Sequence, residues 1–262
     1  WGRFPDVSRV DPKADLVFPW NGTTSGVKAP GADWIAADRE GLVICDATSA
    51  AFAMPLPWER LDVVTFSFQK ALGGEAGLGV AALSPRAIAR LDSYVPPRPV
   101  PKVLRLRNDK GFDRALATGS MINTFSVLTL EDWIDALQWA ESVGGLKALI
   151  ARTEANAAAL AAWVERTDWV DWLAEEPATR STTSVCLKIV DPRVVAMDDE
   201  ARRALVLRMK DLLEREDAAF DIEGHRNAPA GLRVWCGCTV DVADIEALTP
   251  WLDWAFATAM AE

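Results

Sequence analysis

Two side chains that follow apolar runs could carry chemistry, and they lie about two dozen residues apart. Lys70 follows the run LDVVTFSF (61–68) and precedes a glycine-rich turn. A lysine that is buried, or that lies beside another positive charge, has a lowered pKa, and its free amine can form a Schiff base with a carbonyl. The alternative is a lysine at a strand end whose amine reaches solvent. The segment alone leaves both interpretations open.

Asp46 ends a second apolar run, GLVICDA (41–47). Open α/β sheets bind ligands at the carboxyl edge of their strands, where an acid can hold a metal, orient a base or pair with a ring nitrogen. An Asx turn is the plainer alternative. Together, however, a strand-end Asp and a strand-end Lys suit pyridoxal phosphate, because the carboxylate keeps the pyridine nitrogen protonated and the amine binds the aldehyde.

The elements that must position these residues are predicted from the hydrophobic pattern. Four nearly unbroken apolar runs predict strands over 14–20, 41–47, 61–68 and 78–84. Continuous rather than alternating hydrophobicity predicts a mainly parallel sheet that is covered on both faces. Helices are predicted over 84–95, 128–142, 146–167, 198–216 and 242–260, and further strands over 185–190, 219–223 and 232–240. This order indicates an α/β protein with two domains, 1–143 and 144–262, bridged by the helix over 146–167.

Composition limits the classes of function. The chain has 262 residues and a formal net charge of −10, which disfavours a broad surface for nucleic acid or anionic membrane. An anionic ligand must therefore be held by a local group of cations. Four cysteines are too few for a disulfide scaffold, and Cys236 and Cys238 are interpreted as small side chains on one face of a strand rather than as a metal site. With no signal peptide or membrane span evident, a soluble protein of the reducing cytoplasm is expected.

Five segments resemble the phosphoserine aminotransferases, in order and over nearly the whole chain. They are WNGTTSGV (20–27), ICDATSAAFA (44–53), VVTFSFQKALGGEAGLGVAALSPRA (63–87), INTFSVLTLEDWIDAL (122–137) and GHRNAPAGLRVW (224–235). The pattern is similar to the bacterial–archaeal branch of this family, which belongs to the class V aminotransferases of pyridoxal-phosphate fold type I. The resemblance implies a large domain with a mainly parallel sheet and a smaller carboxy-terminal α/β domain. It also implies amino transfer between L-glutamate and 3-phosphohydroxypyruvate in serine biosynthesis, and extends to 4-phosphohydroxythreonine in pyridoxine biosynthesis.

The resemblance assigns four residues to the cofactor. Lys70 would hold pyridoxal phosphate as a Schiff base and move the proton in the 1,3-shift. Asp46 would pair with the pyridinium nitrogen. Thr23 would form a hydrogen bond near the phenolic oxygen or the ring, and Gln69 would help to hold the phosphate.

Five more residues are assigned to the substrate and to a partner subunit. Arg233 would bind the substrate α-carboxylate bidentately. From the neighbouring subunit, His225 and Arg226 would recognise the substrate phosphate, and the pair Asn123–Thr124 would reach the cofactor phosphate. The resemblance therefore implies a homodimer whose active site lies at the subunit interface. Without it, Arg233 is a surface charge, Asn123–Thr124 caps the next helix, and His225 is an exposed or capping residue.

The chain departs from the family at its start. Full-length members begin with a long additional segment that would supply a phosphate cradle, an aromatic residue over the pyridine ring and a substrate-binding arginine, and residues 1–20 offer no replacement. The chain is therefore expected to be truncated. Two alternatives stay open: a non-catalytic remnant that keeps the dimer surface, and another class V enzyme such as a serine–glyoxylate aminotransferase or a cysteine desulfurase. His225–Arg226 argues against the second, because neither substrate carries a phosphate.

Overall fold

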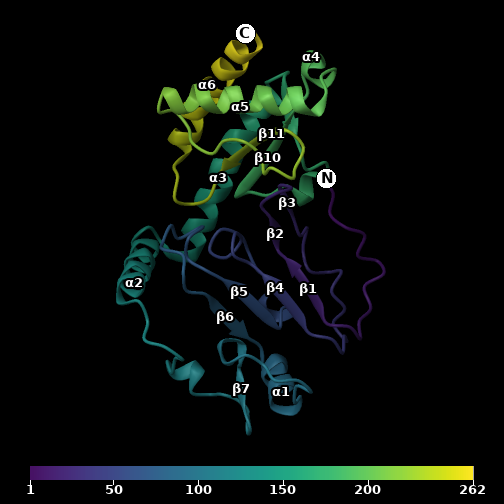
Figure 1. The fold of residues 1–262 in the computed structure, drawn as a ribbon, viewed down its shortest axis with the longest axis vertical. Helices are drawn as coiled ribbons and strands as arrows, with labels where there is room; N and C mark the ends of the chain where they lie inside the picture. Colours follow the sequence, from purple (N-terminus) through teal and green to yellow (C-terminus); the bar gives the residue numbers. More distant parts are fainter. Residues whose placement is uncertain (262) are drawn as a thin grey trace.

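The computed structural model describes residues 1–261 and contains two main sheets, one below the other in Figure 1. The lower sheet has the order β1 (Leu16–Pro19), β4 (Val43–Asp46), β5 (Val63–Phe66) and β6 (Val80–Leu83). Its first three strands are parallel and β6 is antiparallel. The upper sheet is antiparallel and has the order β11 (Gly231–Trp235), β10 (Ser184–Ile189) and β9 (Val170–Trp172). The predicted α/β class with a mainly parallel sheet in its first part is confirmed.

The predicted helices are present, with ends that differ by a few residues. They are α1 (Pro85–Ser93), α2 (Val127–Ser142), α3 (Gly145–Glu165), α5 (Asp199–Arg215) and α6 (Val242–Ala261), joined by a short α4 (Pro192–Val195). Ser84 caps α1 as its sequence predicts, since its hydroxyl accepts a hydrogen bond from the backbone N–H of Ala87 (3.2 Å). Within residues 1–261, not one helix has the length and apolarity needed to cross a bilayer.

Small elements complete the chain. The hairpins are β2 (Asn21–Gly22) with β3 (Val27–Lys28), and β7 (Arg107–Asn108) with β8 (Gly111–Phe112). Short 3₁₀ turns cover Trp58–Arg60, Lys102–Leu104, Leu116–Thr118 and Pro177–Thr179.

Two strand predictions are wrong near the carboxyl end. Residues 219–223 form a turn with one isolated bridge at Glu223, because Asp221 has a φ of 51°, which a strand cannot accommodate. The strand predicted over 232–240 ends at Trp235. Cys236 and Cys238 therefore lie in the following turn rather than on one strand face, although both are fully buried.

The lower sheet buries one face far better than the other. Val43, Cys45 and Val64 lie in a core that includes Trp20 and Met54. The alternation of side chains puts Val17 and Asp46 on the opposite face, where Val17 is 71% exposed. Within residues 1–261 the predicted cover is therefore complete on one face and partial on the other, where Ile44 and Val63 are half-buried.

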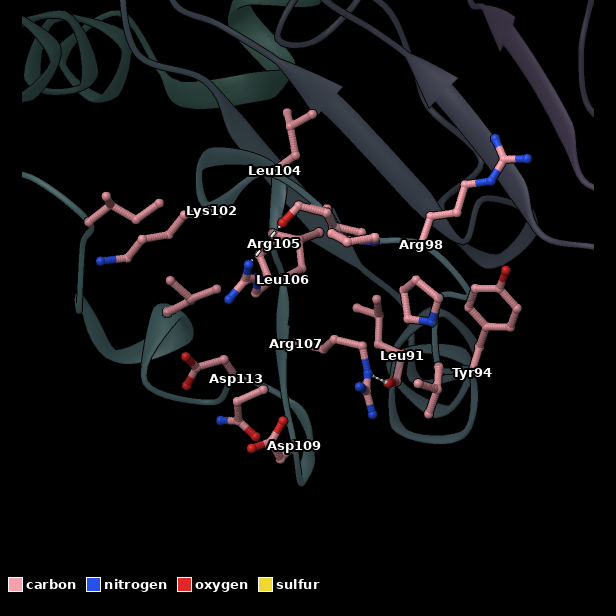
Figure 2. Close-up of a pocket in the computed structure, with 17 residues that line it drawn as sticks. Leu91, Tyr94, Arg98, Lys102, Leu104, Arg105, Leu106, Arg107, Asp109 and Asp113 are labelled. Atoms are coloured by element: carbon pink, nitrogen blue, oxygen red, sulfur yellow. Dashed lines mark hydrogen bonds between the residues drawn. The ribbon is translucent and has the colours of Figure 1, made fainter.

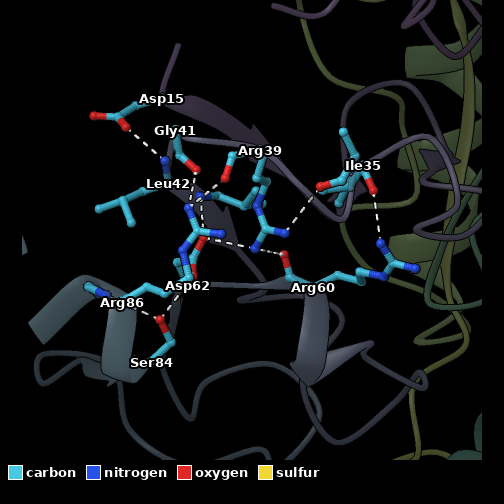
Figure 3. A network of polar contacts seen from close by, with 12 residues as sticks. Asp15, Ile35, Arg39, Gly41, Leu42, Arg60, Asp62, Ser84 and Arg86 are labelled. Carbon is cyan, nitrogen blue, oxygen red and sulfur yellow. Dashed lines mark hydrogen bonds and ion pairs between the residues drawn. The ribbon is translucent and has the colours of Figure 1, made fainter. Parts of the chain in front are cut away.

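A buried carboxylate joins the strands at the other end of this sheet (Figure 3). The Asp62 carboxylate accepts hydrogen bonds from the backbone N–H of Val43 (2.9 Å), the Arg39 guanidinium (2.9 Å) and the Ser84 hydroxyl (2.9 Å), and Arg86 lies 3.7 Å away. Burial by itself raises the pKa of Asp62, but these donors outweigh it and hold that pKa below its usual value. The network ties β4, the start of β5 and the cap of α1 together.

Three hydrophobic clusters form the core. One lies between the upper sheet and α3, α5 and α6, one lies under the lower sheet, and a third surrounds Phe68 and Trp133. The third also takes in Leu149 of α3 and Cys238, so it extends across the boundary predicted at Gly144–Gly145. The division into 1–143 and 144–262 stays a prediction.

Candidate active site

A cavity of about 550 Å³ lies where the turn after β5 meets β11. Of the predicted site residues, it is lined by Thr23, Gln69, Lys70 and Arg233. These side chains come from segments far apart in the sequence: the turn after β2, the turn after β5 and the middle of β11. The structure therefore brings together four of the nine residues that the sequence singles out.

The turn that carries Lys70 is fixed on several sides. The backbone N–H groups of Gly73 and Gly74 donate to the carbonyls of Lys70 (3.1 Å) and Phe68 (3.0 Å). The Phe68 ring stacks on Trp133, with centroids 3.9 Å apart and planes within 5°. Gly73 has a φ of 66°, and a Cβ there would lie 3.1 Å from the Thr239 side chain, so the turn needs a glycine at this point. The half-buried Lys70 side chain is thus presented from a rigid base.

Arg233 reaches the same cavity from the upper sheet. Strand alternation buries Leu232 and Val234 in the core and leaves Arg233 half-buried on the cavity side. The strand is held on one side by pairing with β10 and on the other by the bond from the Arg233 N–H to the Ile222 carbonyl (2.8 Å). A guanidinium positioned this way can bind a carboxylate bidentately.

The sequence interpretation missed Trp235, which lies two residues beyond Arg233 and on the same side of β11. The Lys70 Nζ atom lies 5.9 Å from the centroid of its indole ring, within the range of a cation–π contact. Gly237 makes room for this ring, because a Cβ at Gly237 would lie 2.3 Å from the indole. Side chains alternate along a strand, so the spacing of two residues from Arg233 would have predicted Trp235 as a further residue of the site.

Asp46 does not line this cavity. It lies at the carboxyl end of β4, exposed, and its Oδ1 accepts hydrogen bonds from the backbone N–H (2.9 Å) and the hydroxyl (2.6 Å) of Thr48. This is the Asx turn that the sequence allowed as the plainer alternative. Both bonds end on Oδ1, so the turn does not occupy Oδ2.

Asn123 and Thr124 are also away from the cavity, in the irregular segment before α2, and both are exposed. They do not cap that helix. The cap is Ser126, whose hydroxyl accepts from the Thr129 N–H (3.3 Å). The capping interpretation of Asn123–Thr124 is therefore wrong, and their contact with a partner's cofactor stays a prediction.

His225 and Arg226 lie in the loop before β11, outside the Lys70 cavity. Arg226 is exposed and lines a separate hollow of about 300 Å³ with Arg203. His225 is half-buried, and its Nδ1 accepts a hydrogen bond from the Asn227 N–H (3.2 Å). A neutral ring with Nδ1 as acceptor carries its proton on Nε2, which can then donate to an anion.

The residue paired with Arg233 on the neighbouring strand is uncharged. Cys186 pairs with Arg233 in the β10–β11 register. Burial raises the pKa of the Cys186 thiol to about 11, and the nearby Arg233 charge only partly opposes this. With the thiol protonated, Arg233 has no anionic partner at this position and is available for an acidic ligand.

Comparison with known proteins agrees with this arrangement. The profile of the family described as aminotransferase class V matches residues 7–206. A phosphoserine aminotransferase of Methanosarcina barkeri (strain Fusaro / DSM 804) is 50% identical over 98% of this chain, and the match covers 66% of that relative. The chain thus spans 66% of the length of this relative.

Solved structures share the fold at low identity. A pyridoxal-phosphate-bound phosphoserine aminotransferase from Trichomonas vaginalis has a TM-score of 0.70 at 18% identity, covering 91% of this chain and 60% of that one. An alanine–glyoxylate aminotransferase from Nostoc sp. has a TM-score of 0.71 at 19% identity, covering 93% of this chain and 62% of that one. The fold alone does not separate these activities. The family profile, which extends over most of the chain and includes both Asp46 and Lys70, shows that the chain belongs to the class V aminotransferases.

Proposed function

We propose that this chain carries out the reaction of a phosphoserine aminotransferase, which moves an amino group between L-glutamate and 3-phosphohydroxypyruvate. The observation that carries the proposal is the single cavity shared by the Lys70 amine and the Arg233 guanidinium. Support also comes from the Methanosarcina barkeri relative of that name, at 50% identity. The products would be O-phospho-L-serine and 2-oxoglutarate, with a role in serine biosynthesis and, through 4-phosphohydroxythreonine, in pyridoxine biosynthesis.

Pyridoxal phosphate is the cofactor that this reaction requires, and the donor set of the cavity suits it. Lys70 offers an amine for the aldehyde, and Thr23 and Gln69 offer hydroxyl and amide groups for the phenolic oxygen and the phosphate. The volume of about 550 Å³ is in the range of sites that hold ligands of this size. When bound, the pyridine ring would withdraw electrons from the α-carbon of the amino acid.

Residues of the chain would perform the proton transfer and orient the substrate and the cofactor. Lys70 Nζ would accept the α-proton and return it to the neighbouring carbon. Arg233 would hold the α-carboxylate and so orient the bond that breaks. Asp46 would accept a hydrogen bond from the protonated ring nitrogen on Oδ2, the oxygen that Thr48 leaves free.

Recognition of the substrate phosphate is assigned to His225 and Arg226 of a second subunit. Arg226 supplies a permanent charge, and His225 supplies the Nε2 proton that follows from its bond to Asn227. Because the two residues lie outside the Lys70 cavity of their own chain, a contribution across a dimer is the arrangement that brings them to a substrate.

A homodimer is further supported by the surface of residues 94–122 (Figure 2). This segment surrounds a hollow of about 600 Å³ with apolar walls that include Tyr94 and Leu106, and with Leu104 68% exposed. Its basic part, 98–114, has six Lys and Arg against two Asp, whereas the whole chain is acidic. A second copy of the chain, with its net charge of −10, would attract such a segment. We place the dimer in the reducing cytoplasm, which suits its four free, buried cysteines.

One observation favours a second candidate, a folded chain without transaminase activity. Asp46, the proposed partner of the ring nitrogen, lies outside the cavity that holds Lys70. A chain that bound the cofactor weakly or not at all would keep the fold and the dimer surface but lack turnover.

The experiment adds pyridoxal phosphate to the purified chain, reduces it with borohydride and maps the modified lysine by peptide mass spectrometry. We expect modification at Lys70 and its loss in Lys70→Ala. Lys28 is the control, because it is also half-buried and burial lowers the pKa of its amine. A chain labelled at Lys28 as readily as at Lys70 would show non-specific amine chemistry and overturn the cofactor assignment.

Substrate choice is tested by turnover of O-phospho-L-serine against L-serine. We expect the phosphorylated substrate to be preferred, and Arg226→Ala to remove the preference without abolishing labelling of Lys70. Equal rates for the two substrates would point to another class V activity. Labelling at Lys70 without turnover of either substrate would favour the non-catalytic candidate.

A further inference from the structure

A buried polar cluster connects the lower sheet to the upper sheet beside the cavity. Its members are Asn21, Ser49, Ser181 and Thr183, all at most 5% exposed. Asn21 and Ser49 belong to the lower part of the molecule, whereas Ser181 and Thr183 precede β10 of the upper sheet. Polar side chains this deeply buried need hydrogen-bond partners nearby, from one another or from the backbone.

The bonds among Asn21, Ser49 and Thr183 have defined directions. The hydroxyls of Ser181 and Thr183 lie 3.5 Å apart, and either oxygen can be the donor. The hydroxyls of Ser49 and Thr183 donate to backbone carbonyls, those of Asn21 (3.3 Å) and Ser49 (3.0 Å) respectively. Their oxygens are therefore left as acceptors, and the Asn21 Nδ2 donates to both, at 2.8 Å and 3.1 Å. One amide group thus holds two hydroxyls from two parts of the chain.

This arrangement carries a cost. The Asn21 Oδ1 atom is buried and has no hydrogen-bond partner within residues 1–261. Burying polar groups costs more than burying an apolar contact of the same shape. A polar cluster kept under this penalty fixes one relative position, because hydrogen bonds tolerate little displacement, whereas apolar surfaces can slide.

The cluster lies between two residues of the cavity. On one side, Asn21 begins the turn that carries Thr23, and the same turn is joined to the upper sheet by the bond from the Ser181 N–H to the Gly26 carbonyl (2.8 Å). On the other side, the Thr183 carbonyl accepts from the Cys236 N–H (2.7 Å), at the end of the strand that carries Arg233.

We infer that Asn21 and Thr183 are positioning residues, which hold Arg233 at a fixed distance from Thr23 and Lys70. Their effect on the reaction rests on the proposed transaminase function, whereas the mechanical connection does not. A substrate held by Arg233 reacts only if its α-carbon lies within reach of the Lys70 amine, so a displaced upper sheet lowers the rate of reaction more than the binding of substrate.

The mechanical connection is tested by hydrogen–deuterium exchange in three variants of the chain. Thr183→Val keeps the shape and removes the hydroxyl, Thr183→Ser keeps the hydroxyl, and Thr182→Val changes a half-buried neighbour that lines a different hollow. We expect exchange of residues 22–27 and 181–186 to rise about tenfold in Thr183→Val, and to stay at the original rate in the other two. Equal exchange in Thr183→Val and Thr183→Ser would overturn the inference. If Thr183→Val does not fold, Ser49→Ala replaces it, since it removes the other hydroxyl that Asn21 holds.

The positioning role is tested by turnover of the unreduced chain, divided by the fraction of chains that borohydride labels at Lys70 in a parallel sample, so that unfolded or cofactor-free chains do not count. We expect kcat for O-phospho-L-serine to fall about tenfold in Thr183→Val with KM changed less than about threefold, and to recover in Thr183→Ser. An unchanged kcat in a variant with raised exchange would refute positioning while leaving the connection intact. If the original chain has no turnover, the proposed function fails, and the exchange result still decides whether the connection exists.

Discussion

At the scale of single residues, Asp62 has the largest predicted effect on stability. Its side chain is 2% exposed and faces Arg39, whose side chain is 8% exposed. Removing one partner of a buried ion pair leaves an uncompensated charge, so Asp62→Asn is expected to lower the free energy of unfolding by about 3–5 kcal/mol. Urea denaturation at neutral pH measures this. Asp171→Asn, which removes the half-exposed partner of Lys188, should cost less than about 1 kcal/mol.

The same carboxylate gives a pH dependence with a defined sign. Because the folded pKa of Asp62 lies below its unfolded value, its contribution is complete above the unfolded value of 3.8 and is lost as the pH falls through the folded value. The difference in unfolding free energy between the original chain and Asp62→Asn should therefore shrink in acid. A difference that stayed constant from pH 7 to below pH 4 would contradict the assigned charge.

Arg233 is expected to act on substrate affinity. Lysine at this position keeps the charge but loses the planar fork that binds two carboxylate oxygens. Arg233→Lys should raise KM for glutamate by roughly tenfold to a hundredfold, which corresponds to the loss of one charged hydrogen bond. Steady-state kinetics measures this, and Arg208→Lys, on α5 outside the cavity, should leave KM unchanged. Comparison with Thr183→Val separates two effects: loss of substrate binding raises KM, whereas loss of positioning lowers kcat.

At the scale of elements, α3 supports the cavity through Asn156, beside a bond from Arg152 Nε to the Cys238 carbonyl (3.1 Å). The buried Asn156 amide Nδ2 donates to the carbonyls of Cys236 (3.3 Å), Gly237 (3.1 Å) and Val240 (2.8 Å). These residues form the turn that follows Trp235. Asn156→Ala should cost about 2–3 kcal/mol of unfolding free energy, since it leaves buried carbonyls unpaired.

Thermal or urea denaturation checks this cost, with Glu154→Ala, an exposed substitution on the same helix, as the control. Labelling of Lys70 by pyridoxal phosphate should also weaken in Asn156→Ala, because the turn determines where the Trp235 ring lies. Full labelling in a destabilised variant would confine Asn156 to a structural role.

The elements also mark where prediction from the sequence succeeds. Apolar runs and the Ser84–Pro85 start located β4, β5 and α1, because burial and capping are local signals. They could not predict that AFDIE is a turn, since the left-handed backbone of Asp221 arises from the packing of the chain around it. Likewise, just beyond the end of β11 the Trp235 indole covers Gly237, a contact that no periodicity encodes.

The candidate site shows the same contrast between what the sequence predicts and what only the fold reveals. Residue types and resemblance singled out Lys70, Thr23, Gln69 and Arg233, and the fold places these four around one cavity. The sheet face on which Asp46 lies depends on strand register, which the sequence pattern left undetermined. The Asn21–Thr183 connection joins residues 162 positions apart, so neither residue is distinguished before the fold is known.

At the scale of the whole molecule, charge is unevenly distributed. A chain of net charge −10 carries six of its 28 Lys and Arg in residues 98–114, where they outnumber the two Asp and lie beside exposed apolar side chains. Leu104→Asp places a negative charge in the centre of this surface, where it would repel a second, acidic copy of the chain. We therefore expect this substitution to shift a dimer toward monomer.

Sedimentation velocity at several protein concentrations measures this shift. Val195→Asp, at another exposed apolar position in α4, is the matched control and should leave the association unchanged. A monomer in both the original chain and the variant would refute the dimer for this chain. Salt should weaken the association, because charges at a rim are screened.

The reactivity of the Cys238 thiol can report how often the turn that carries Lys70 opens. The thiol is fully buried and donates to the Ala71 carbonyl (2.9 Å), one residue beyond Lys70. A reagent such as an aromatic disulfide can reach this sulfur only when the turn separates from the upper part of the molecule, so the rate of its reaction counts openings of the site. A ligand that bridges Lys70 and Arg233 would slow this reaction, and occupancy could be followed through a cysteine that takes no part in the chemistry.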